Sequence, residues 1–160
     1  MLKSRERVSE TALKNTLPIR ILAAILLFAL SSTANGPTLV VIVNKANPIS
    51  EITKSQLKKL ILGKQSKWPG GAEVSVLLGP AGEPDRKTAL QRYCGMTEAD
   101  FAEWFLHAIF KGESLAAPKS MPSVQSIVTV VQIVPGAIGF VDSAYVGNQV
   151  KVIGISTSAE

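Results

Sequence analysis

A chain of 160 residues is the size of one domain and leaves no room for a second independent core. Its single cysteine, Cys94, excludes an intramolecular disulfide, so the fold must be held by its hydrophobic core. The formal charge is +5, but five of the 17 Lys and Arg residues lie within the first 20 positions, so the charge does not indicate a nucleic-acid partner.

The first 34 residues have the order of a secretory signal peptide. A basic stretch ends at Arg20, an uninterrupted apolar run covers Ile21 to Leu30, and the small residues Ser32 and Ala34 follow. The apolar run is about half the length of a membrane span. We therefore expect cleavage after Ala34 and an exported domain over residues 35–160, whose net charge is near +2 because 12 basic and 10 acidic residues remain. The long basic stretch leaves an uncleaved membrane anchor as the alternative.

The first half of the exported domain predicts a strand, a helix and a second strand. Thr38 to Val43 is a continuous β-branched run, which is typical of a strand buried on both faces. Thr53 to Gln56 has the spacing of a capping box and opens a helix that ends at Gly63. After a turn, Ala72 to Leu78 alternates between apolar and polar residues and predicts the second strand.

The second half predicts three helices and two strands. One helix begins at Pro84, runs to Tyr93 and stops at Gly95; Thr97 caps the next, which ends near Lys111. The segment from Ser123 to Val134 has the β-branched content of a strand but the length and N-cap of a helix, and we predict a helix. The remaining strands are Ile138 to Val141 and Val150 to Ile155. Alternating strands and helices predict an α/β domain with a mixed sheet flanked by helices.

The residues that carry chemistry in enzymes are sparse in this chain. His107 is the only histidine and lies within an apolar helix pattern, and Cys94 reads as a buried, inert thiol. Neither residue belongs to a metal-ligand spacing. Glu98 and Asp100 fall in the first turn of a helix, where carboxylates complement the helix dipole. We expect a protein that is not an enzyme and that uses no cofactor and no metal.

Two glycine-rich junctions remain as candidate binding loops. The first runs from Gly79 to Gly82, with Arg86, Lys87 and Thr88 shortly after it, and the second contains Gly136 and Ala137. Such loops present backbone N–H groups to an anion, especially where a helix follows. The alternative is a tight turn that requires glycine for its backbone angles. Glu83 and Asp85 would repel an anion at the first junction.

Three blocks of the sequence together resemble a known family. They are Leu57 to Gly70 (LKKLILGKQSKWPG), Trp104 to Gly112 (WFLHAIFKG) and Val134 to Val141 (VPGAIGFV). Their order and spacing resemble those of phosphate-type periplasmic substrate-binding proteins. The resemblance implies one lobe, or a reduced form, of the type II periplasmic binding protein fold. It also implies a periplasmic location and capture of a small oxyanion such as phosphate for an ABC transporter, in contact with its permease or another envelope protein.

The chain departs from this family where the family binds phosphate. The family has an arginine followed by aspartate and a Ser-Gly-Thr turn at a helix start, and here the corresponding stretch is Leu78 to Pro84 (LGPAGEP). We therefore take Gly79, Gly82, Arg86, Lys87, Thr88, Gly136 and Ala137 as the candidate ligand-binding residues. The alternative function is an envelope interaction module that keeps the fold without a ligand.

Overall fold

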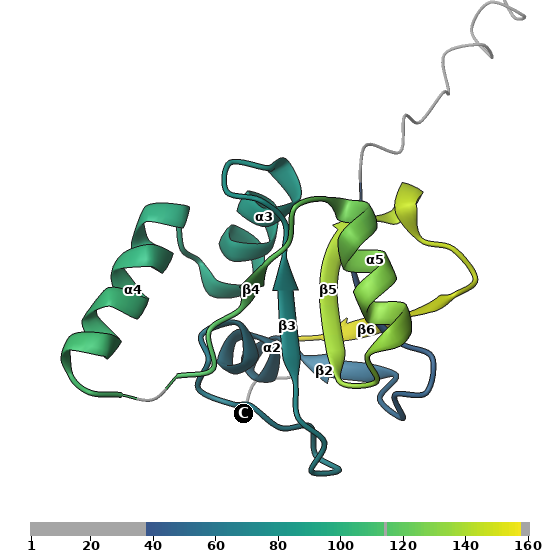
Figure 1. The fold of residues 1–160 in the computed structure, drawn as a ribbon, viewed down its shortest axis with the longest axis horizontal. Helices are drawn as coiled ribbons and strands as arrows, with labels where there is room; N and C mark the ends of the chain where they lie inside the picture. The colour runs from purple at the N-terminus through teal and green to yellow at the C-terminus, as the bar shows by residue number, and fades with distance from the viewer. Residues whose placement is uncertain (1–37, 114, 158–160) are drawn as a thin grey trace, which may run out of the picture. The chain divides into compact units, whose positions relative to one another are not determined.

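Six strands form one mixed sheet in the order β2-β6-β1-β5-β3-β4 (Figure 1). The central strand β1 pairs antiparallel with β5 and β6, whereas β3 runs parallel to β5 and β4, and β2 runs parallel to β6. The strands are β1 (Leu39–Asn44), β2 (Glu51–Thr53), β3 (Ser75–Leu78), β4 (Lys119–Ser120), β5 (Ala137–Asp142) and β6 (Val150–Ser156). The mixed sheet with flanking helices confirms the predicted fold class.

The computed structural model describes residues 38–113 and 115–157, all of which lie in one unit of the chain, Pro37–Glu160. The predicted signal peptide lies outside the described residues. Among the described helices, none is long and apolar enough to cross a membrane.

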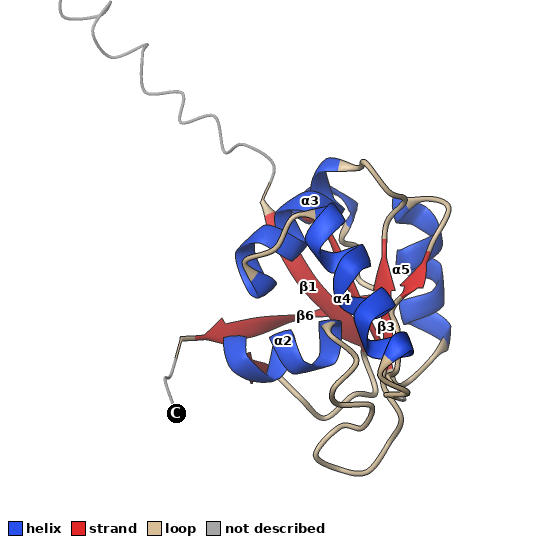
Figure 2. Cartoon of the chain, turned by 90° about the vertical axis from the view of Figure 1, so that its left-hand side faces the viewer, coloured by secondary structure: helices blue, strands red, loops and turns tan. Residues whose placement is uncertain are grey.

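Helices cover both faces of the sheet (Figure 2). Helix α2 (Lys54–Ile61), helix α3 (Pro84–Ala89) with the π-helical turn η1 (Leu90–Cys94), and helix α4 (Glu98–Phe110) contribute to the larger core cluster. Helix α5 (Val124–Ile133) packs on the opposite face, where Ile127 and Val131 are fully buried. Alternate residues of β1 enter the two clusters, because successive side chains of a strand point to opposite faces.

The predicted helix boundaries depend on caps that the structure contains. Thr53 and Thr97 each form a capping box, with Gln56 and Asp100 respectively, and the Ser123 hydroxyl accepts a hydrogen bond from the Ser126 N–H. The segment after Ser123 is therefore helical, as predicted. The helix that begins at Pro84 changes from α to π geometry after Ala89 and ends at Gly95, as predicted.

Two short strands were not predicted, and the start of one predicted strand differs by three residues. Strands β2 and β4 contain three and two residues at the sheet edges, too few to produce an alternating pattern. Strand β3 begins at Ser75 rather than Ala72, because the Ala72 carbonyl accepts a hydrogen bond from the Trp68 N–H within the preceding turn.

Helix α5 packs closely on β5 at Gly139, where an added Cβ would lie 2.4 Å from Ile127 Cγ2.

Candidate functional site

The loop between β3 and α3 turns at the first predicted glycine junction. Strand β3 ends at Leu78, and helix α3 begins with Pro84 in its first position. Gly82 has a φ of 90°, a conformation that side-chain-bearing residues rarely adopt. The tight-turn interpretation is therefore correct for Gly82, and the same turn leaves its backbone N–H directed toward α4.

Arg86 folds back from α3 over this loop. Its Nη1 donates a hydrogen bond to the Gly79 carbonyl oxygen at 3.0 Å, and its Cζ lies 5.9 Å from the centre of the Phe101 ring. Only 15% of the Arg86 side chain is exposed. A guanidinium that is removed from water to this extent requires a nearby negative charge.

The negative charge comes from Glu98, the first residue of α4. The Gly82 N–H donates to both carboxylate oxygens of Glu98, at 3.0 Å and 3.2 Å. Arg86 Nε lies 2.9 Å from one of these oxygens; because Nε makes no hydrogen bond within the described part of the chain, this contact is an ion pair. We call the Gly82 N–H together with the Arg86 guanidinium the anion cradle. In the structure the cradle holds a carboxylate of the same chain.

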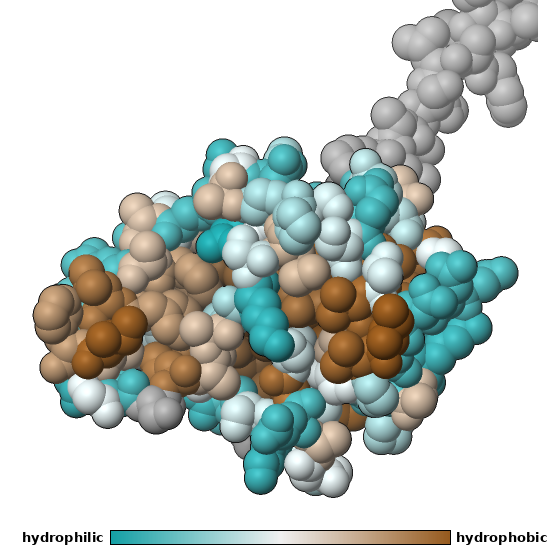
Figure 3. Space-filling view, in the orientation of Figure 1, coloured by the Kyte–Doolittle hydropathy of each residue, from teal (hydrophilic) through white to brown (hydrophobic). Residues whose placement is uncertain are grey.

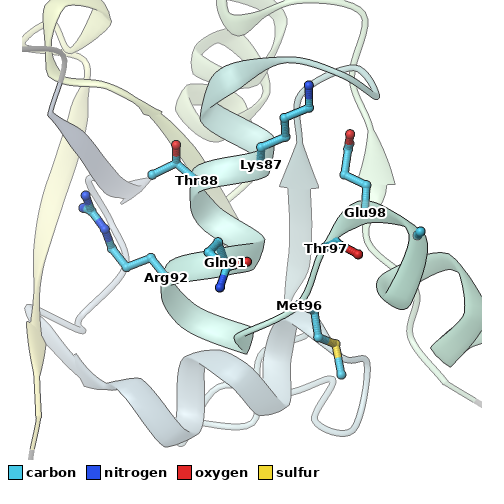
Figure 4. A pocket seen from close by; sticks show the side chains of 8 residues that line it. Lys87, Thr88, Gln91, Arg92, Met96, Thr97 and Glu98 are labelled. Carbon is cyan, nitrogen blue, oxygen red and sulfur yellow. The ribbon is translucent and has the colours of Figure 1, made fainter.

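Lys87 and Thr88 face a different space from Arg86. They lie along a cavity of about 730 Å³ beside α3, η1 and the start of α4, and Figure 4 shows their side chains with those of neighbouring lining residues. Glu98 lines this cavity as well as filling the cradle. The remaining lining residues are Gln91, Arg92, Met96, Thr97 and Ala99. The cavity thus has cationic side chains at its edge and opens next to the cradle.

One of the two carboxylates expected to repel an anion is engaged elsewhere. Asp85 Oδ2 accepts a hydrogen bond from the Asp142 N–H at 2.9 Å, which ties α3 to the end of β5. Glu83 is exposed and makes no side-chain hydrogen bond as the N-cap of α3.

The second glycine junction lies beside the start of β3, whereas the first follows the end of β3. Ala137 pairs with Ser75 at the start of β3, four residues before Gly79, a separation of roughly 13 Å along an extended strand. A Cβ on Gly136 would lie 1.9 Å from the Glu73 carbonyl oxygen, and Ala137 is fully buried. The structure therefore brings Gly79, Gly82 and Arg86 together, places Lys87 and Thr88 beside them, and separates Gly136 and Ala137 from them.

The two side chains with catalytic potential lie outside the cradle. Burial raises the pKa of the Cys94 thiol to about 11, so the thiol is neutral at physiological pH, as its inert interpretation requires. His107 is exposed on α4, with its Nε2 3.2 Å from Glu103 Oε1. Within residues 38–113 and 115–157, no three His, Cys, Asp or Glu side chains are grouped so that they could hold a metal ion.

Sequence reasoning missed Glu98 as a site residue. Its position after the Thr97 N-cap indicates a favourable interaction with the helix dipole, and nothing local indicates that its carboxylate reaches a loop 16 residues earlier. Only the packing of α4 against the loop after β3 reveals that contact.

Several solved structures with a similar fold are described as phosphate-binding or phosphate-transport proteins. A TM-score of 0.60 relates the chain to an ABC-type phosphate transport receptor from Vibrio cholerae, with 21% identity over 77% of this chain and 48% of that one. PstS from Borrelia burgdorferi has a TM-score of 0.59, with 14% identity over 78% of this chain and 49% of that one. A third structure, from Clostridium perfringens, is described as a putative phosphate ABC transporter substrate-binding protein with bound phosphate. Its TM-score is 0.60, with 20% identity over 74% of this chain and 45% of that one.

These similarities show that the chain shares the fold of the aligned part of these structures. The chain spans less than half the length of each of these three structures. No family model matches the sequence, and no curated protein matches it either.

Proposed function

We propose that this chain is an exported, non-catalytic binding protein that holds a small oxyanion, such as phosphate, in the anion cradle. The observation that carries the proposal is the carboxylate of Glu98, which the Gly82 N–H and the Arg86 guanidinium already hold. A phosphate presents the same kind of acceptor oxygens with more negative charge. Charged hydrogen bonds to such oxygens are about twice as strong as neutral ones.

Positive charge near the cradle supports an anionic ligand. Lys87 and Arg92 place two further cations along the adjacent cavity, and Thr88 adds a hydroxyl. The similar solved structures are phosphate-binding and phosphate-transport proteins by their descriptions. Gly136 and Ala137 are not part of this proposal, because Gly136 packs against the Glu73 carbonyl just before β3 and Ala137 is fully buried.

The proposed location is the periplasm, and the proposed partner is the permease of an ABC transporter. The location rests on the signal-peptide pattern of residues 1–34 and the partner on the phosphate-transport neighbours.

The proposal is tested by following backbone amide resonances during titration with phosphate and with sulfate. We expect a saturable shift of the Gly82 amide, with a dissociation constant in the millimolar range. Urea, as a neutral solute, should give no such shift. Lys45→Gln removes an exposed cation at the end of β1 and serves as a charge control that should titrate like the wild type. A folded protein whose Gly82 amide is unmoved by both anions would refute oxyanion binding.

A second candidate, the envelope interaction module, has one observation in its favour. Figure 3 shows an apolar patch over α4, where Leu106, Ile109 and Phe110 are 54%, 70% and 80% exposed. Patches of this kind mark interaction sites more often than isolated apolar residues do. Crosslinking in the envelope fraction should then give one defined product that Phe110→Ser abolishes, whereas unchanged crosslinking would remove this candidate.

A further inference from the structure

The cradle is filled in this structure by a side chain that is well placed to leave it. We propose that Glu98 is the resident anion of the cradle and that an oxyanion ligand binds by displacing it. This inference rests on the proposed function, and it adds a residue that controls access and selects the charge of the ligand. The geometry behind it is the convergence of Gly82 N–H and Arg86 on one carboxylate, at 2.9 Å to 3.2 Å.

The start of α4 does not depend on the Glu98 side chain. The Thr97 N–H donates to Asp100 Oδ2 at 3.0 Å, and the Asp100 N–H donates to Thr97 Oγ1 at 3.2 Å, which closes the capping box. These bonds satisfy helix-terminal donors and fix the first turn of the helix. The Glu98 carboxylate can therefore leave the cradle while the backbone that carries it stays in place.

The displaced carboxylate can move into the adjacent cavity. Glu98 lines the cavity of about 730 Å³, and 24% of its side chain is exposed in the bound position. Rotation of the side chain toward this cavity would return the carboxylate to water and uncover the Gly82 N–H. Lys87, on the edge of the same cavity, offers the displaced carboxylate a new cationic neighbour.

Arg86 determines what can replace Glu98. Its guanidinium is mostly buried, and an uncompensated charge at such a position is costly, so an empty cradle is disfavoured. A neutral solute would leave Arg86 without a negative partner. The replacement must therefore be an anion, with at least one oxygen placed to contact both groups, as Glu98 Oε1 contacts the Gly82 N–H and Arg86 Nε here.

Displacement lowers the apparent affinity of the wild type. A ligand binds only to the fraction of molecules whose cradle is open, and the apparent dissociation constant rises in proportion. An internal contact worth 1–2 kcal/mol corresponds to a factor of about 5 to 30. We therefore expect Glu98→Ala to bind phosphate about 10-fold more tightly than the wild type.

The experiment compares phosphate binding and thermal unfolding in the full domain for the wild type, Glu98→Ala and Glu103→Ala. Glu103 lies on the same helix, is 67% exposed and pairs with His107, so its removal changes the net charge equally without touching the cradle. Calorimetric titration should give the 10-fold gain for Glu98→Ala and no gain for Glu103→Ala. Phosphate should also raise the unfolding temperature of Glu98→Ala more than that of the wild type, because tighter binding to the folded state gives greater stabilisation.

The outcomes separate this inference from the proposed function. Equal phosphate affinity in the wild type and Glu98→Ala would overturn the displacement role and leave oxyanion binding intact. Absence of binding in both folded proteins would overturn the proposed function and this inference together. If Glu98→Ala does not fold, Glu98→Gln replaces it; this variant keeps the shape of the side chain without its charge, and an affinity equal to that of the wild type would again overturn the inference.

Discussion

Two regions of this molecule are built from different kinds of interaction. One consists of the hydrogen bonds that connect the three sequence blocks described above, which we call the joints, and the other is the anion cradle. In the joints, Trp68 Nε1 donates to the Gly136 carbonyl oxygen at 3.2 Å, and Trp104 Nε1 donates to the Leu62 carbonyl oxygen at 3.3 Å. These bonds connect Leu57–Gly70 to Val134–Val141 and to Trp104–Gly112. The cradle lies outside all three blocks and uses a backbone N–H, one arginine and one carboxylate.

The difference explains why the fold is easier to recognise than the ligand. An indole N–H donor requires tryptophan at a fixed position, and the approach of the Glu73 carbonyl oxygen requires glycine at position 136, so the joints leave a recognisable sequence pattern. A backbone N–H is supplied by almost any residue, so an anion site built around it leaves a weaker pattern. Variants of the joints should therefore change stability and leave anion affinity unchanged, whereas variants of the cradle should change anion affinity.

The largest effect is expected at a joint, from Gly136→Ala. The new Cβ would lie 1.9 Å from the Glu73 carbonyl oxygen, and backbone must move to relieve this clash. We expect a loss of about 3 kcal/mol in the free energy of unfolding, measured by urea denaturation. Gly154→Ala is the matched control, since its Cβ would lie 3.7 Å from the nearest atom and should cost far less. Similar losses in the two variants would contradict the account of this joint.

The next effect is expected in the cradle, from Arg86→Gln. Glutamine keeps a polar side chain but removes the charge that attracts the anion, so phosphate affinity should fall at least about 10-fold, or ~1.4 kcal/mol. Arg86→Lys keeps the charge without the planar fork and should fall between the wild type and Arg86→Gln. Titration of the Gly82 amide measures all three proteins. Unchanged affinity in Arg86→Gln would separate Arg86 from the binding site.

A smaller effect is expected from Trp68→Phe. Phenylalanine keeps most of the buried ring but removes the hydrogen bond to the Gly136 carbonyl oxygen, which retains a bond from the Ser75 N–H at 3.1 Å. The free energy of unfolding should fall by about 1 kcal/mol, with no change in phosphate affinity. A change in affinity comparable to that of Arg86→Gln would show that the joints and the cradle are coupled.

The last effect, absent at neutral pH, is a pH dependence of the stability of the fold rather than of anion binding. Burial raises the pKa of Cys94 from 9.0 to about 11, so between these pH values the thiol ionises in the unfolded chain before it ionises in the folded one. Stability should decline as the pH rises through this window, because the unfolded state then binds fewer protons. Urea midpoints at pH 7 and pH 10.5 measure the decline, and Cys94→Ala should lack this component.

Much of the fold could be predicted from sequence because local signals and tertiary packing agree. The capping boxes at Thr53 and Thr97, the glycine ends at Gly63 and Gly95, and the β-branched run of β1 all act within a few residues of the elements they define. The edge strands β2 and β4 escaped prediction because two or three residues carry no periodicity. Their pairing depends on neighbours distant in sequence.

The residues of the candidate cradle could be inferred only in part from the sequence, for a different physical reason. Gly82 and Arg86 lie four residues apart at one junction, so a loop followed by a helix is enough to suggest them. Glu98 reaches them only because α4 returns past the loop, and Gly136 was included because glycine required by a close backbone approach looks the same in sequence as glycine in a binding loop.

Whether the junction after β3 is an oxyanion site can be decided by locating a bound anion in a crystal. A crystal of Glu98→Ala grown with tungstate would show the tungsten atom by its anomalous scattering. We expect a single strong peak with oxygens within hydrogen-bond distance of Gly82 N and the Arg86 guanidinium. An empty cradle in that crystal, or tungstate bound only at other places on the chain, would contradict the claim.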